Sequence, residues 1–186
     1  MNTKNLDLET QKLFIKAEKL RSQKKFIDAI TVFQKILKKY PNFVPVLNNM
    51  GMSFEGIKNN DEAEKYYLMC LNISPDELIS INNLSRLYFL KRNHKKAIPL
   101  FQKSLTIETD QKLVAEMLAE SLFNLGLIKE ANFFCEQAIK RYPESYLIKF
   151  FYGKNLLKIG QHQKGLKLMD SLVGAIEFND KEFIIR

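Results

Sequence analysis

The chain has 186 residues, of which 46% are apolar, and this length suffices to bury a core as one domain or as an array of repeats. It contains no run of about 18 apolar residues and no apolar run near its start, so we expect neither a membrane-spanning helix nor a secretory signal. Two cysteines make no disulfide framework. The net charge of +8 fits either the lysine-rich composition of an AT-rich genome or binding to nucleic acid or an anionic surface. We expect a cytoplasmic protein.

Similar residues return every 34 positions, as in the phrases LNNMG and INNLS that begin at Leu47 and Ile81. Two series of small residues keep this spacing: Ala29, Ala63, Ala97, Ala131, Gly165, and Ala17, Gly51, Ser85, Ala119, Gly153. A bulkier series and a turn series keep it too: Phe33, Tyr67, Phe101, Cys135, Met169, and Pro41, Pro75, Thr109, Pro143, Glu177. A fixed period without insertion indicates tandem structural repeats.

Within one period the apolar residues recur at helical steps, as Leu47, Met50 and Phe54 do. A polar break at residues 58–61 separates this stripe from the next, and we expect Asp61 to cap the second helix. Proline ends that helix in three periods because it lacks a backbone donor and restricts the residue before it. Each period therefore predicts two antiparallel helices.

The landmarks of the second period resemble those of the tetratricopeptide repeat: Leu47, Met50-Gly51, Phe54, Ala63, Tyr67 and Pro75. The resemblance covers about residues 10–178. It implies an all-α fold, a right-handed α-solenoid of five tandem helix-turn-helix repeats. The tryptophan of the family pattern is absent, and the third and fifth repeats lack the closing proline.

In chain order, we expect a segment at 1–9 that leads into the first helix, and then the repeats. The predicted repeats span residues 10–43, 44–77, 78–111, 112–145 and, in degenerate form, 146–178. A tail at 174–186 overlaps the last repeat, and its apolar residues alternate on both sides of Asn179-Asp180, which predicts a hairpin. The tail either caps the last helix or leads into a further domain, and the sequence leaves both open.

Chemistry typical of enzymes is missing. The sequence contains no Gly-rich phosphate loop and no hydrolase or metalloprotease motif, so we predict no catalytic residue and no cofactor. His94 and His162 lie 68 residues apart in equivalent inter-helix turns, where we expect them to be solvated and too distant to share a metal. Cys70 and Cys135 continue apolar stripes and are expected to be core thiols.

The resemblance also implies a concave groove, lined by the first helix of each pair, that binds a peptide or helical segment of a partner. Carried over by position, the predicted peptide-binding residues are Asn48, Asn49, Met52, Glu55, Asn82, Asn83, Arg86, Phe89, Glu120, Phe123 and Lys154. We expect Asn49 and Asn83 to form an amide ladder against a peptide backbone, and Arg86 to bind a carboxylate or phosphate. The places of the dicarboxylate clamp of chaperone-binding members hold other residues, so that mode is not expected.

Three alternatives stay open. The chain can be an N-terminal docking module of a larger enzyme or assembly, because its tail leaves the repeat pattern. It can bind RNA or an acidic partner through basic inter-helix turns, of which the most basic holds Lys91, Arg92, Lys95 and Lys96. It can also self-associate through the apolar fifth repeat.

Overall fold

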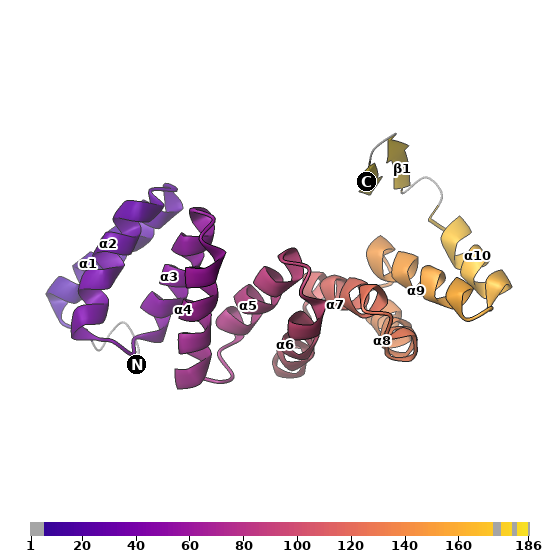
Figure 1. Ribbon diagram of the computed structural model, residues 1–186, viewed down its shortest axis with the longest axis horizontal. Helices are drawn as coiled ribbons and strands as arrows, with labels where there is room; N and C mark the ends of the chain where they lie inside the picture. Colours follow the sequence, from indigo (N-terminus) through magenta and orange to yellow (C-terminus); the bar gives the residue numbers. More distant parts are fainter. Residues whose placement is uncertain (1–5, 173–175, 180–181, 186) are drawn as a thin grey trace. The chain divides into compact units, whose positions relative to one another are not determined.

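A computed structural model describes residues 6–172, 176–179 and 182–185, and these form ten helices followed by two strands (Figure 1). The helices are α1 Leu8–Ser22, α2 Phe26–Lys39, α3 Val44–Gly56, α4 Asn60–Ile73, α5 Leu78–Leu90, α6 His94–Ile107, α7 Lys112–Asn124, α8 Ile128–Arg141, α9 Tyr146–Lys158 and α10 His162–Asp170. The prediction of an all-α helical-repeat fold is confirmed. The predicted hairpin is present as β1 Ile176–Asn179 paired antiparallel with β2 Glu182–Ile185. Its turn, residues 180–181, lies outside the described part of the chain.

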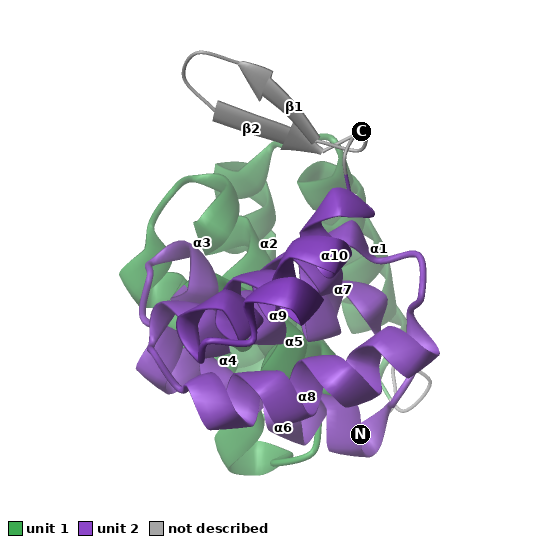
Figure 2. Ribbon diagram, turned by 90° about the vertical axis from the view of Figure 1, so that its right-hand side faces the viewer, with its two compact units in different colours: residues 1–87 green, residues 88–186 purple. Residues whose placement is uncertain are grey.

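The chain divides into two compact units, Met1–Leu87 and Tyr88–Arg186, and the boundary falls within α5 (Figure 2). In the first unit α1 packs against α2, α3 against α4, and α2 against α3. In the second unit α7 packs against α6, α8 and α9, while α9 also packs against α8 and α10. Neighbours in sequence are therefore neighbours in space within each unit. The repeat boundaries themselves stay a prediction.

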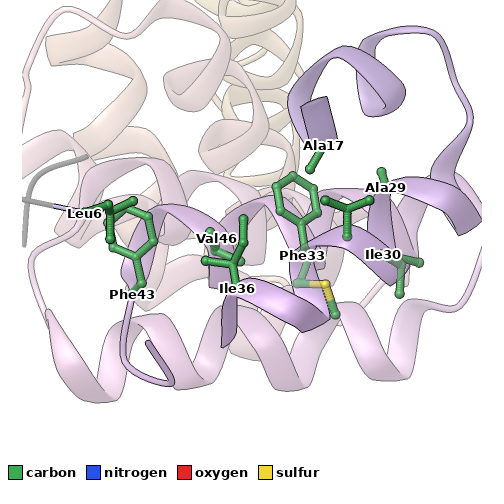
Figure 3. Close-up of a cluster of buried hydrophobic side chains, with 10 residues drawn as sticks. Leu6, Ala17, Ala29, Ile30, Phe33, Ile36, Phe43 and Val46 are labelled. Atoms are coloured by element: carbon green, nitrogen blue, oxygen red, sulfur yellow. The ribbon is translucent and has the colours of Figure 1, made fainter. Parts of the chain in front are cut away.

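The core of the first unit runs between α1, α2 and α3 (Figure 3). Phe33 and Phe43 are fully buried, and the ring of Phe14 lies tilted against both, at 6.4 and 5.9 Å between centroids. Ala17 and Ala29, one from each small series, are also fully buried in this cluster. A larger side chain at either position would separate α1 from α2, which explains the small residues.

The second unit has a core of its own, centred on α7, α8 and α9. It contains Ala119, Cys135, Ile148 and Leu156, all at most 2% exposed. Cys135 is a free thiol, as is Cys70 in the first unit, and burial raises their pKa values to about 12 and about 11 respectively. The prediction of core thiols is confirmed.

Side-chain caps fix several helix starts. Asp7 accepts from the backbone N–H of Thr10 at the start of α1, and Ser145 accepts from that of Ile148 at the start of α9. The prediction that Asp61 caps α4 is wrong, since Asn59 does so by accepting from the N–H of Glu62. Asp61 lies in the first turn of α4, where its negative charge interacts favourably with the helix dipole and stabilises the helix.

Candidate functional site

In the first unit, polar side chains link the first helices of successive pairs. The amide Nδ2 of Asn49 in α3 donates to Glu18 Oε1 in α1 at 3.4 Å. The amide Nδ2 of Asn83 in α5 donates to Asn48 Oδ1 in α3 at 3.1 Å. Asn83 therefore contacts Asn48 rather than Asn49, and the expected amide ladder of Asn49 and Asn83 against a peptide stays a prediction.

The two neighbouring asparagines of α3 are nearly enclosed. Asn48 is 8% exposed and Asn49 is 7% exposed. The Oδ1 atom of Asn48 also accepts from Ser80 Oγ at 3.3 Å, and its Nδ2 lies 3.9 Å from the Met52 sulfur. These amides therefore join α1, α3 and α5, and their contribution to peptide binding stays a prediction.

Arg86 of α5 and Glu55 of α3 form an ion pair, with 38% and 15% of their side chains exposed. Glu55 Oε2 accepts from Arg86, whereas its buried Oε1 has no hydrogen-bond partner within the described residues. Behind this pair, burial and then the Glu55 carboxylate raise the pKa of the enclosed Tyr67 hydroxyl. Arg86 thus stays partly exposed, and its binding of a carboxylate or phosphate stays a prediction.

Phe89 and Asn82 complete the predicted residues of α5. The Phe89 ring meets Phe101 and His94 edge-on, at 6.2 and 5.8 Å between centroids, so much of it belongs to the packing of α5 on α6. Asn82 is half-buried. Asn82, Asn83 and Arg86 are thus all half-exposed polar residues of α5, and Asn83 and Arg86 are bonded to the first unit's network.

His94 differs from expectation. Predicted to be solvated, it is only 8% exposed, because α6 begins at this residue and places the ring against α7. Its Nδ1 lies 3.1 Å from Ser121 Oγ, and Asn124 Nδ2 donates to its Nε2 at 3.4 Å. Desolvation lowers the pKa of His94, the nearby Glu120 carboxylate opposes this shift, and Arg92 adds to it. His162 lies exposed at the equivalent start of α10, as predicted.

In the second unit, two lysines of α9 lie over aromatic rings. The Lys154 ammonium is 4.8 Å from the centroid of Phe123 and 5.0 Å from that of Phe150, and the Lys158 ammonium is 4.1 Å from Phe123. Phe151 joins Phe123 and Phe150 at 5.5 and 5.3 Å between centroids. We call these five residues the Lys–Phe cluster. Lys158 was missed from the sequence, although it follows Lys154 by one helical turn.

Two basic side chains of the turn between α5 and α6 already make contacts within the second unit. Arg92 Nη1 lies 3.5 Å from Glu120 Oε1, and the Lys96 ammonium lies 4.8 Å from the centroid of the Tyr88 ring. Arg92 also has a φ of 56°. Part of this positive charge is therefore held by contacts within the second unit.

Neither a metal site nor a membrane span is found in the part of the chain that the structure describes. Within it, no group of three His, Cys, Asp or Glu side chains is placed to hold a metal ion. None of its helices combines the length and apolarity needed to cross a membrane. A hollow of about 190 Å³ against α8 is lined by residues including Leu105, Phe134 and Arg141. This lining contains no carboxylate, histidine or cysteine that would support acid–base or nucleophilic catalysis.

Sequence comparisons match most of the chain to one kind of repeat. Two models, both described as tetratricopeptide repeat, match residues 43–110 and residues 17–42 and 116–145. Protein O-mannosyl-transferase TMTC3 of Mus musculus is 28% identical over 164 residues, which are 80% of this chain and 18% of that protein. Uncharacterized protein ycf37 of Pyropia yezoensis is 28% identical over 119 residues, covering 59% of this chain and 67% of the relative. The chain thus spans less than a fifth of the transferase.

Solved structures with the same fold include several of MamA. A MamA AMB-1 structure superposes with a TM-score of 0.79 and 18% identity, covering 89% of this chain and 90% of that one. The MamA RS-1 ArsTM double mutant gives a TM-score of 0.79 at 10% identity, covering 90% and 94%. At this level of identity the likeness shows the fold.

Proposed function

This chain belongs to the tetratricopeptide repeat family, and from this premise we propose that it is a non-catalytic scaffold that binds a peptide or helical segment of a protein partner. The binding surface is the face of the first helices, and the protein acts in the cytoplasm. The observation that carries the proposal is the polar network of the first unit, in which α1, α3 and α5 present half-exposed groups on one face.

The accessible atoms of this network suit an extended backbone. Asn83 donates its Nδ2 to Asn48, which leaves its Oδ1 to accept from a peptide N–H. Arg86 uses one side of its guanidinium for Glu55, and the other can donate to a carbonyl or carboxylate. Asn48 holds Asn83 and Glu55 holds Arg86, so that little ordering is needed on binding.

The test is affinity capture from a lysate of the source organism, with nuclease present. The wild-type chain is compared with the variant Asn83→Ala/Arg86→Ala and with Lys38→Ala, which removes one positive charge from the exposed surface of α2. We expect a protein that the wild type and Lys38→Ala recover, and that the double variant loses at unchanged circular dichroism. Binding of that purified protein is then measured by calorimetry.

Equal recovery by the double variant would contradict binding on this face. Loss of every partner on nuclease treatment or in moderate salt would instead favour the basic turn around Lys91 and Lys95. Dimerisation of the pure chain, disrupted by the same double variant, would assign the face to self-association.

A second candidate is a docking module within a larger enzyme or assembly. It is favoured by the likeness to TMTC3, in which the matched stretch makes up 18% of a protein named as a transferase. The gene that encodes the chain decides this point. A longer reading frame with a catalytic domain supports the candidate, and a reading frame that encodes residues 1–186 alone contradicts a place within a larger enzyme chain.

A further inference from the structure

We propose that the Lys–Phe cluster of the second unit (Phe123, Phe150, Phe151, Lys154 and Lys158) binds an acidic segment of a partner protein, in which two carboxylates lie at alternate positions of an extended backbone. The inference rests on the proposed function and gives it a partner chemistry. It concerns α7 and α9, and it is independent of the Asn83 and Arg86 groups of the first unit.

Uncompensated positive charge is the first argument. The carboxylates of α7 are occupied, since Glu116 accepts from Ser145 Oγ at 2.7 Å and Glu120 pairs with Arg92 at 3.5 Å. Among the described residues, no carboxylate oxygen lies within 4.0 Å of the ammonium group of Lys154 or Lys158. Within the described part of the chain, the charges of these two lysines therefore meet aromatic rings rather than carboxylates.

The aromatic rings prepare the two ammonium groups for binding a carboxylate. A ring beneath an ammonium group orders the lysine and removes part of its water, so that a carboxylate meets a positioned charge. Both ammonium groups are within 5 Å of the Phe123 centroid. The side chain of Lys154 is half-buried and that of Lys158 is exposed, so the pair is reachable from solvent.

The spacing of the lysines defines the ligand. Lys154 and Lys158 are one helical turn apart, a separation of about 5–6 Å between Cβ atoms. Two carboxylates at alternate positions of an extended peptide are about 7 Å apart and match this distance. Successive side chains of an extended segment point to opposite sides, so the residue between the two carboxylates points away from the lysines.

Nucleic acid fits this surface less well. Binding of single strands uses aromatic faces on which bases stack. Here Phe123 is approached by two lysines, and Phe150 is packed at 76° against Phe151. Two lysines without a stacking platform match side-chain carboxylates better than a string of phosphates.

The test uses fluorescein-labelled peptides and anisotropy. One peptide carries Glu-Phe-Glu between glycine-serine flanks, and its matched control carries Gln-Phe-Gln. We expect the acidic peptide to bind the full chain at least about tenfold more tightly than the control, and this difference to vanish in Lys154→Gln/Lys158→Gln. The variant Lys154→Arg/Lys158→Arg retains charge and is expected to retain most of the binding.

The control for net charge is Lys12→Gln/Lys16→Gln, which removes two exposed lysines of α1 at the same spacing. It should bind the acidic peptide like the wild type. Equal affinity for both peptides, or equal loss in both lysine variants, would overturn the proposal. So would tighter binding of oligouridylate than of the peptide at the same lysines, or a rise in affinity in Glu177→Gln/Glu182→Gln, which would assign the cluster to the chain's own tail.

Failure of this inference is separable from failure of the proposed function. If the capture experiment recovers a partner that depends on Arg86 while no acidic peptide binds, the scaffold stands and the Lys–Phe cluster is not a site. If the acidic peptide binds through Lys154 and Lys158 while capture is insensitive to Asn83 and Arg86, the binding face of the first unit is wrong instead.

Discussion

At Gly51 of α3, the ring of Tyr67 occupies the space where a side chain would begin. A Cβ built on Gly51 would lie 2.4 Å from Tyr67 Cε1. Gly153 holds the same place three repeats later, but there the Cβ would meet the Met169 sulfur at 2.8 Å, the end of a flexible chain. The same repeat position therefore has a rigid neighbour in one unit and a yielding one in the other.

This difference predicts unequal effects of one substitution. Gly51→Ala should lower the free energy of unfolding by about 1–3 kcal/mol, because the ring is locked in the core and overpacking displaces it. Gly153→Ala should change it by less than about 1 kcal/mol, because Met169 can move and alanine favours the helix. Urea denaturation of both variants measures this. Equal losses would show that the methionine is as constrained as the tyrosine.

His94 predicts a pH dependence of stability. The ring accepts from Asn124 at Nε2, and its other nitrogen faces Ser121, so the fold holds it neutral. Its pKa is lowered, and unfolded histidine protonates near pH 6.5. Neutral His94 therefore contributes fully to the free energy of unfolding above about pH 6.5. This contribution is lost as the pH falls from there through the lowered pKa of the folded state.

The comparison is between wild type, His94→Gln and His162→Gln in urea unfolding at pH 7.5, 6.5 and 5.5. Wild type and the exposed-site control His162→Gln should lose stability more steeply than His94→Gln over this range. The outcome that contradicts the argument is an identical slope for all three proteins, since carboxylates then explain the whole dependence.

At the scale of the helix pair, the chain turns through a left-handed residue in every repeat. The φ angles are 60° at Lys24, 61° at Lys58, 56° at Arg92, 73° at Gly126 and 79° at Gly160. These five positions keep the 34-residue period. Lys24, Lys58 and Arg92 therefore occupy turn positions whose positive φ favours glycine.

Exchanging residues between equivalent turns tests this constraint. Lys58→Gly should raise the free energy of unfolding by up to about 1 kcal/mol, because glycine adopts positive φ without a steric penalty. Gly126→Lys should lower it by about 1–2 kcal/mol. Thermal unfolding of the two variants shows the sign directly. A loss in Lys58→Gly would mean that the lysine side chain contributes more than its backbone costs.

The period predicted the helix pairs because small and bulky residues recur wherever helices must meet, as at Ala17, Ala29 and Phe33. It did not predict which side chains pair. Asn83 contacts Asn48 rather than Asn49, and the repeat length alone does not define which of these two neighbouring asparagines faces Asn83. The burial of His94 was missed because the sequence pattern assigned this residue to a turn, whereas it is the first residue of α6.

At the scale of the whole molecule, helices contact their neighbours along the chain within each unit. Stability in such arrays is a sum of repeat terms and nearest-neighbour interfaces, so local damage should spread only a short way. The substitution Gly51→Ala disturbs the packing of α3 on α4. Helix α3 also contacts α1 and α2, so the disturbance can reach those two helices.

Hydrogen exchange monitored by mass spectrometry can follow that spread. In Gly51→Ala we expect faster amide exchange in α1 to α4 and unchanged exchange in α9 and α10, because opening of a few helices needs less free energy than unfolding of the whole chain. Gly153→Ala is the matched control and should leave α1 to α4 as they are in the wild type. A uniform acceleration across all ten described helices in Gly51→Ala would contradict the argument, since it would require the two units to unfold as one cooperative body.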